Sequence, residues 1–333
     1  MKRKGNLIGK IAELDNLYLA YTKACRGKRG KREVLEFEQN FDENISQLQK
    51  EILSGNVDVG HFTHFRIYDP KPRLISAPAF KERVLHHAIM NICDEYFDKT
   101  LLETIYASRK GKGVYAAIEK AIKEMPRYQW SAKLDYRKYY DSIDHNVLKT
   151  QLRKKYKDKI LLAIFDRIID SYSVNPDKGL PIGNLTSQYF ANFYLSELDH
   201  LAKHQLKIPV YIRYMDDILI LGCSRDFLRQ ACRELAVLSE QKLYLRLKPA
   251  IINLSKNGQN FLGYKVYPHR YYLSGRSKRR FRTKYLRYEK LYETSVWNEQ
   301  QLVNHLIPLL AFTQHSVSGK FRKSCIGNCR KRV

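Results

Sequence analysis

Three aspartates have the type and spacing to carry out chemistry. Asp216 and Asp217 are adjacent between two apolar runs in "VYIRYMDDILILG" at 210–222, and Asp135 closes a further apolar run. Like charges a few ångströms apart repel, so the pair lies either in a solvated turn, where Asp is common, or beside a cation. Magnesium favours clustered carboxylates. Two such ions about 4 Å apart activate an attacking hydroxyl and stabilise a leaving group in phosphoryl transfer.

The hydrophobic pattern predicts the elements that would position these aspartates. Residues 210–222 predict a hairpin with the two acids at its tip. Trp130, Ala132 and Leu134 alternate with polar residues, which predicts a strand whose opposite face carries Asp135. Asp144 follows at a position typical of a helix N-cap. The three carboxylates are therefore expected at the ends of strands.

Helices and strands alternate irregularly along the rest of the chain. Apolar spacing predicts helices over 10–55, interrupted by a basic loop at 26–32, then after 78, from 185 and over about 225–240. A hairpin is predicted at 62–78, with strands around 243–253 and 260–267. Past Tyr272 the chain becomes strongly basic and then helical, and Pro308 should kink or end the segment 302–310. This mixture, without a βαβ rhythm, predicts an α+β fold.

The charge predicts a polyanionic partner. Across 333 residues, 60 Lys and Arg against 34 Asp and Glu give a net charge of +26, spread along most of the chain. No apolar stretch approaches the length of a membrane span, and the N-terminus does not resemble a signal peptide, so a cytoplasmic protein is expected. The scattered cysteines fit reduced thiols. Cys325 and Cys329, with His315 nearby, are a weak zinc candidate because a second ligand pair is missing.

Together the motifs resemble those of reverse transcriptases. The resemblance rests on "KLDYRKYYDSIDH" as motif A, "GLPIGNLTSQYFANFYLSELD" as motif B, "YMDD" as motif C and "LRLKPAIINLSKNGQNFLGYKVYP" as motifs D and E. With "PKPRLISAPAFKERVLHHAI" in the fingers, it covers about 60–320 in the family's order. It implies a right-hand polymerase fold with fingers and an N-terminal helical extension at 1–128, a palm with an antiparallel sheet at 129–270 and a short helical thumb at 271–333.

The resemblance also implies roles for individual residues. Asp135, Asp216 and Asp217, with the Tyr136 carbonyl, would hold two Mg²⁺ ions, for which Mn²⁺ could substitute. The implied nucleotide-binding residues are Arg73, Lys71, Tyr140, Ile182, Gly183 and Lys248. Phe261, Leu262, Gly263 and Tyr264 would form the primer grip. The implied nucleic-acid contacts are Arg276, Lys278, Arg279, Arg280, Arg282 and Lys284. Lys71 as a solvated hairpin charge, Tyr140 as a core residue and the basic run as a solvated helix face remain open.

Motif B narrows the resemblance. It reads Ile182-Gly183 and ends in Ser187-Gln188, where most of the family has Gln-Gly and Ser-Pro. This form resembles reverse transcriptases of diversity-generating retroelements, which copy a template-repeat RNA into cDNA with frequent errors at adenines. Isoleucine cannot form the glutamine's hydrogen bond, which contributes about 1 kcal/mol, or roughly fivefold in discrimination. Ile182 is therefore expected to lower fidelity, unless it merely fills a core gap.

The same resemblance implies partners. These are template RNA, the cDNA or primer, deoxynucleoside triphosphates and an accessory variability protein, a small basic helical pentamer. Rival readings are a reverse transcriptase from a retron, an abortive-infection system or a group II intron. A catalytically inactive RNA-binding protein on a polymerase scaffold is a further alternative, which the retained aspartates disfavour.

Overall fold

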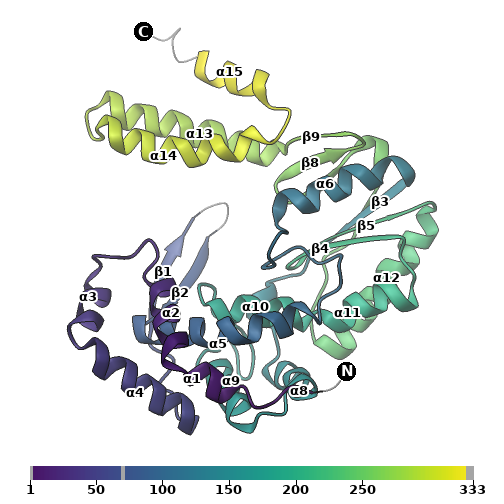
Figure 1. Ribbon diagram of the computed structural model, residues 1–333. Coiled ribbons are helices and arrows are strands. Elements are labelled where there is room, and N and C mark those ends of the chain that lie inside the picture. Colours follow the sequence, from purple (N-terminus) through teal and green to yellow (C-terminus); the bar gives the residue numbers. More distant parts are fainter. Residues whose placement is uncertain (1–2, 69–71, 328–333) are drawn as a thin grey trace. The chain divides into compact units, whose positions relative to one another are not determined.

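The computed structural model describes residues 3–68 and 72–327 and combines helices with antiparallel sheets, which confirms the α+β prediction (Figure 1). The chain divides into two compact units. Unit 1 comprises Met1–Glu103, Tyr136–Leu201 and Leu235–Leu247, and unit 2 comprises Thr104–Asp135, Ala202–Glu234 and Lys248–Val333. In the described part of the chain, every helix is too short or too polar to span a bilayer.

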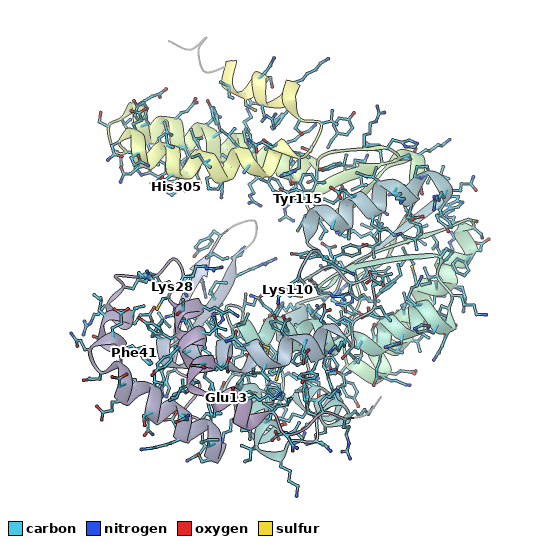
Figure 2. All side chains as sticks on the ribbon, viewed as in Figure 1. Glu13, Lys28, Phe41, Lys110, Tyr115 and His305 are labelled. Carbon is cyan, nitrogen blue, oxygen red and sulfur yellow. The ribbon has the colours of Figure 1, made fainter. Side chains whose placement is uncertain are left out.

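Unit 1 is mainly helical. Its helices are α1 (Ile8–Ala12), α2 (Leu14–Ala24), α3 (Arg32–Gln39), α4 (Phe41–Ser54), α5 (Phe80–Asp98), α7 (Tyr139–Ser142), α8 (His145–Lys155), α9 (Lys159–Asp170), α10 (Leu185–Tyr194) and α11 (Ser196–His200). Aromatic rings join α2 to α4, where Phe41, labelled in Figure 2, stacks on Tyr18 with ring centroids 5.8 Å apart. Asp144 caps α8 as expected, because its carboxylate accepts from the Val147 amide at 3.1 Å.

The predicted hairpin at 62–78 also belongs to unit 1. Strands β1 (Phe62–Ile67) and β2 (Arg73–Pro78) pair antiparallel, with Ile67 opposite Arg73 and Phe62 opposite Pro78. Most of β1 is exposed, whereas Ser76 and Pro78 of β2 are buried. The hairpin therefore has one strand that rests on the body of unit 1.

Unit 2 is built on an antiparallel sheet in the order β4-β5-β3-β6. These strands are β3 (Trp130–Leu134), β4 (Val210–Tyr214), β5 (Asp217–Gly222) and β6 (Ile251–Leu254). Helix α6 (Val114–Glu124) packs Ala117, Ile118 and Ala121 against Ile212 and Leu219 of the sheet. Helix α12 (Arg225–Leu243) follows β5. The predicted hairpin at 210–222 and the strand before Asp135 are both confirmed.

A second sheet in unit 2 leads to the C-terminal helices. Strands β7 (Gln259–Phe261), β8 (Tyr264–Tyr267) and β9 (Arg270–Leu273) form a meander, followed by α13 (Gly275–Glu293), α14 (Glu299–Gln314) and α15 (Gly319–Gly327). Figure 1 shows α13 and α14 side by side, and Phe281 and Tyr285 of α13 pack against Leu306 and Leu310 of α14.

The structure differs from two local predictions. Pro308 does not end its segment, because α14 runs from Glu299 to Gln314 with the proline inside, and a kink at this position stays a prediction. A capping box between Asn298 and Gln301 and the apolar contacts of α14 with α13 stabilise that helix despite the missing amide. The predicted strand at 243–253 is confined to β6 (Ile251–Leu254), because residue 243 still belongs to α12 and, of residues 244–250, only Leu247 forms an isolated bridge, to Tyr136.

Candidate active site

The three aspartates meet at one edge of the sheet in unit 2. Strands β3 and β5 pair with Leu134 opposite Ile218, so Asp135, the next residue, lies at the level of Asp217. Tyr214 pairs with Asp217 across a tight turn made of Met215 and Asp216. The hairpin tip and the end of β3 therefore lie at the same edge of the sheet, as the strand pattern predicted.

Two lysines neutralise this acidic edge. Lys133 Nζ lies 2.9 Å from Asp217 Oδ1, and Lys248 forms an ion pair with Asp135. The backbone amide of Lys248 also donates to the Asp135 carbonyl at 2.8 Å, which holds the lysine beside the end of β3. In this arrangement no three His, Cys, Asp or Glu side chains among residues 3–68 and 72–327 converge on a metal position. The carboxylates attract cations, and the cations that they hold are ammonium groups.

The environment of Asp217 fits a bound cation. Burial raises the pKa of this carboxyl, the negative charge of Asp135 adds to the rise, and the two lysines oppose it. Its Oδ1 is buried, and its charge is balanced by the Lys133 ammonium 2.9 Å away. A buried carboxylate oxygen paired with a cation is the kind of hard oxygen donor that a divalent ion prefers.

A buried arginine supports the turn that carries the aspartates. Arg213 on β4 is fully buried, and its guanidinium donates to the Met215 carbonyl at 3.1 Å. Met215 has φ +52°, a conformation that costs energy for a residue other than glycine. This role could not be predicted from the residue type, because an arginine within a strand usually faces water.

The predicted nucleotide-binding residues that the structure describes are in unit 1, apart from Lys248. The Ser76 amide of β2 donates to the Ile182 carbonyl at 2.9 Å, so the motif B segment extends the edge of the hairpin. Gly183 has φ +128°, and a Cβ there would lie 3.1 Å from the Ser76 oxygen. The Leu180 amide donates to the Tyr140 carbonyl at 2.9 Å. The hairpin, α7 and motif B are thus joined by backbone hydrogen bonds.

The side chains of the predicted nucleotide-binding residues differ in exposure. Arg73 is exposed at the start of β2, and Ile182 and Tyr140 are partly buried. Lys71 lies outside the described residues. Tyr136 is buried in unit 1, and its hydroxyl lies 2.9 Å from Ser239 Oγ. Nothing in this geometry assigns its carbonyl to a metal.

The predicted primer grip forms the turn between β7 and β8. Phe261 and Tyr264 are buried in the core of unit 2, and Leu262 and Gly263 both adopt positive φ. Ser277 Oγ donates to the Gly263 carbonyl at 2.6 Å, which ties this turn to the start of α13. Only the turn residues are placed to touch a ligand through their backbone.

The predicted nucleic-acid contacts all lie on α13. Ser274 begins this helix by accepting from the Ser277 amide at 3.1 Å. Arg276, Arg279 and Arg282 are exposed, whereas Lys278, Arg280 and Lys284 are partly covered. Repulsion within such a row is relieved by a polyanion, so the helix has the charge expected of a phosphate-binding surface.

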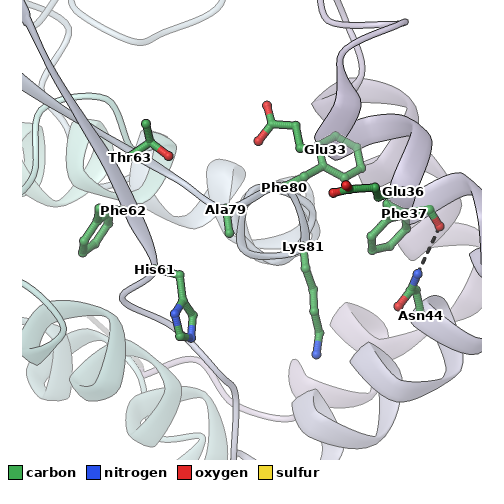
Figure 3. Close-up of a pocket in the computed structure, with 10 residues that line it drawn as sticks. All are labelled: Glu33, Glu36, Phe37, Asn44, His61, Phe62, Thr63, Ala79, Phe80 and Lys81. Carbon is green, nitrogen blue, oxygen red and sulfur yellow. Dashed lines mark hydrogen bonds between the residues drawn. The ribbon is translucent and has the colours of Figure 1, made fainter.

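Neither the pocket of unit 1 nor the zinc candidate coincides with these residues. The pocket, of about 720 Å³, is lined by Glu33, Glu36, Phe37, Asn44, His61, Phe62, Thr63, Ala79, Phe80 and Lys81 (Figure 3). Its two carboxylates disfavour a phosphate ligand. Cys325 packs against α13 and α14, the ring of His315 lies tilted against that of Tyr115 with centroids 3.9 Å apart, and Cys329 lies outside the described residues.

Residues 68–266 match the family described as reverse transcriptase (RNA-dependent DNA polymerase). The chain is 24% identical over 210 residues to the putative COX1/OXI3 intron 1 protein of Saccharomyces cerevisiae, covering 59% of this chain and 25% of that protein. It is 21% identical to protein YkfC of Escherichia coli, covering 46% and 45% of the two chains. The group II intron-encoded protein LtrA of Lactococcus lactis is 25% identical over 39% of this chain and 22% of its own.

A solved structure of telomerase from Candida albicans, in complex with a fragment of telomeric RNA, covers 88% of this chain and 60% of its own. The two chains are 12% identical, with a TM-score of 0.49. The chain spans from about a quarter to less than half the length of the first two curated relatives.

Proposed function

The chain belongs to the reverse transcriptase (RNA-dependent DNA polymerase) family, and on that basis we propose that it copies a template-repeat RNA into error-prone cDNA. In this proposal the errors fall at template adenines and diversify a target gene. The observation that carries the polymerase part is the shared edge of the sheet, where Asp135 lies beside Asp217 at the hairpin tip. An acidic edge of this kind in a strongly basic chain suits phosphoryl transfer on nucleic acid.

Divalent ions are the expected cofactor, since reverse transcriptases generally use them. Asp135, Asp216 and Asp217, with the Tyr136 carbonyl, would hold Mg²⁺ or Mn²⁺, which lowers the pKa of the attacking hydroxyl and neutralises the leaving pyrophosphate. The chain's own side chains do the rest. Lys133 and Lys248 hold the carboxylates that the ions would need, so they would have to give up these ion pairs. Lys248 would then be free of Asp135 and could protonate the pyrophosphate.

The residues around the start of β2 and motif B, rather than the cavity beside Glu33 and Glu36, are proposed to receive the nucleotide. Arg73, with Lys71 as a second cation, would bind the triphosphate, because a guanidinium fork matches phosphate oxygens. Tyr140 would exclude a 2′ hydroxyl by its bulk. The hydrogen bond from the Ser76 amide to the Ile182 carbonyl fixes the backbone of Ile182. Its apolar side chain is therefore held in the proposed nucleotide site.

The domain assignment and partners follow from the same proposal. Residues 1–128 would be the fingers with an N-terminal extension, 129–270 the palm and 271–333 a short thumb. The turn at Leu262 and Gly263 would hold the primer end. The template–primer duplex would bind the cationic face of α13, by which we mean Arg276, Lys278, Arg279, Arg280, Arg282 and Lys284. The accessory variability protein is proposed as partner without a located interface, and the cytoplasm as the compartment.

The mutagenic role is tested by sequencing cDNA. The chain is purified with and without a co-expressed small basic helical partner and given a candidate repeat RNA. Ile182→Gln should lower misincorporation opposite template adenine by about fivefold, because one polar contact is restored, while cDNA yield stays the same. Equal rates of misincorporation opposite template adenine in both enzymes would show that Ile182 does not set fidelity. Accurate copying by the parent enzyme at adenines would contradict the mutagenic role and leave RNA copying standing.

A role in a group II intron is the main alternative, because relatives such as LtrA are intron-encoded proteins. The same experiment separates the two when intron RNA is offered as a competing template. Preferential binding and copying of intron RNA, without adenine errors, would favour the intron role.

A further inference from the structure

Asn184 is buried without a hydrogen-bond partner beside the predicted fidelity residue. Its side chain is 1% exposed, and neither its Oδ1 nor its Nδ2 makes a hydrogen bond to any described atom. Thr186, two residues later, is also buried, and its hydroxyl has no partner either. Buried amide and hydroxyl groups are nearly always paired, so two unpaired groups this close together require an explanation.

Helix capping does not supply that explanation. Asn184 is the N-cap of α10, where an asparagine oxygen normally accepts from an amide of the first helical turn. The backbone of Asn184 has the extended geometry that allows this bond, with φ −89° and ψ 142°, yet its side chain makes none. The residue therefore destabilises the fold twice, by leaving a helix end uncapped and by burying an unsatisfied amide.

The surroundings of Asn184 connect it to the proposed copying site. Gly183 and Ile182 precede it, and the Ile182 carbonyl accepts from the Ser76 amide at 2.9 Å. A Cβ on Gly183 would lie 3.1 Å from Ile75 Cγ2, so this segment packs tightly on β2. Since isoleucine has no polar side-chain atom, Asn184 is the first residue after Ile182 with a group that can read a base.

We propose that Asn184 is a specificity-determining residue whose carboxamide hydrogen-bonds the edge of a nucleobase in the copying site. A carboxamide offers one acceptor and two donors, which complement base edges and pair especially well with adenine. To reach a base, the carboxamide would have to change its side-chain rotamer and leave the position in which it lacks partners. This inference rests on the proposed copying of RNA, and the base belongs either to the template or to the incoming nucleotide.

The test uses the opposite effects of one substitution on stability and on selectivity. Asn184→Leu keeps a similar volume and removes the unsatisfied amide. Thr186→Val is the matched control, because it removes an unsatisfied hydroxyl from the same helical turn without touching the proposed reader. Thermal unfolding is measured for both variants and the parent. Single-nucleotide incorporation is then measured with each of the four template bases and each of the four deoxynucleotides.

Asn184→Leu should unfold at the same or a higher temperature than the parent. Its ratio of correct to incorrect kcat/KM should change by about fivefold for at least one base, the equivalent of one hydrogen bond. Thr186→Val should also be no less stable, with every ratio unchanged. A change that follows the template base whichever nucleotide enters identifies the template as the base read, and the converse identifies the nucleotide.

Four results would overturn the inference. Ratios that stay within about twofold of the parent in Asn184→Leu, against the expected hydrogen-bond effect, show that the amide reads no base. A lower unfolding temperature for Asn184→Leu shows that the amide stabilises the fold. Equal changes of ratio in both variants show a general effect of the helix start. A parent chain that incorporates no nucleotide on any RNA template overturns the copying function itself, and the inference with it.

Discussion

The guanidinium of Arg213 donates a hydrogen bond to the Met215 carbonyl, 3.1 Å away, at the start of the turn that carries Asp216. Arg213 is fully buried. Burying a guanidinium costs free energy unless hydrogen bonds to its N–H groups compensate for the lost water. Met215 has φ +52°, a conformation that its surroundings must stabilise. The hydrogen bond between these two residues thus stabilises a strained turn and fixes the position of the aspartates that it carries.

Arg213→Met should lower kcat by about a hundredfold, because a shift of about 1 Å in a catalytic group has an effect of that size. The affinity for RNA should not change, since the cationic face of α13 is intact. Arg213→Lys, which keeps the charge, should recover part of the loss. Arg225→Met is the control, because Arg225 is exposed and lies over the Trp130 ring at 5.5 Å. Equal kcat in Arg213→Met and the parent, with both folded, would show that Arg213 only fills space.

Lys133 competes with a divalent ion for Asp217, since its ammonium lies 2.9 Å from the carboxylate. Lys133→Met should therefore lower the Mg²⁺ concentration that gives half-maximal activity, by about threefold for an ion pair of this exposure. Primer extension over a Mg²⁺ titration measures this midpoint. Lys120→Met, which breaks the ion pair with Glu124 elsewhere in unit 2, should leave it unchanged. A higher midpoint in Lys133→Met would mean that the lysine assists metal binding.

Gly183→Ala tests the contact between motif B and β2. The glycine has φ +128°, and a Cβ would lie 3.1 Å from both Ile75 Cγ2 and the Ser76 oxygen. The free energy of unfolding should fall by about 1 to 3 kcal/mol. The KM for nucleotides should rise, because motif B and β2 would pack less tightly around the proposed nucleotide site. Gly9→Ala in α1 is the control, because its Cβ would meet nothing within 4 Å. Equal stability of the Gly183 variant and the parent would contradict this packing.

His86 predicts a loss of stability in acid. Burial lowers its pKa to about 3, and neither ring nitrogen has a hydrogen-bond partner. Its Nε2 lies 3.5 Å from Glu82, but a neutral imidazole forms no ion pair. The unfolded chain, with an ordinary histidine pKa near 6.5, binds the proton more strongly. Stability should therefore rise with pH between about 3 and 6.5 and be lost as the pH falls through that window.

His86→Leu should flatten this slope by up to about 1.4 kcal/mol per pH unit. Urea unfolding of both chains between pH 4 and pH 7 measures the difference. His61 is the comparison, because its hydrogen bond with Asp58 raises its pKa and gives the opposite sign. Parallel stability curves for His86→Leu and the parent would show that the imidazole is not kept neutral.

The regular elements around the site could be predicted because apolar residues alternate there with a clear period. This holds for β3, for the hairpin of β4 and β5 and for the capped start of α8. Their register follows from the turn, since Tyr214 opposite Asp217 leaves only Met215 and Asp216 between the strands. For this reason, the position of the aspartates at one edge of the sheet could be predicted from the sequence.

What could not be predicted depends on tertiary contacts. Arg213 is a charged residue within an apolar strand and would ordinarily face water, yet four residues of β4 in a row are buried. The pairing of Lys133 with Asp217 depends on the register between β3 and β5. Asn184 reads as a helix cap, and only its surroundings show that it caps nothing. Composition does not reveal which polar groups lack partners.

The central claim is that the acidic edge at Asp135, Asp216 and Asp217 catalyses RNA-templated DNA synthesis. Asp216→Asn tests it most directly, with primer extension on RNA in Mg²⁺ measured beside RNA binding and thermal unfolding. Synthesis should disappear in the variant, as it should in the parent when the metal is chelated, while RNA affinity and unfolding temperature stay the same. Undiminished synthesis by a folded Asp216→Asn chain would contradict it.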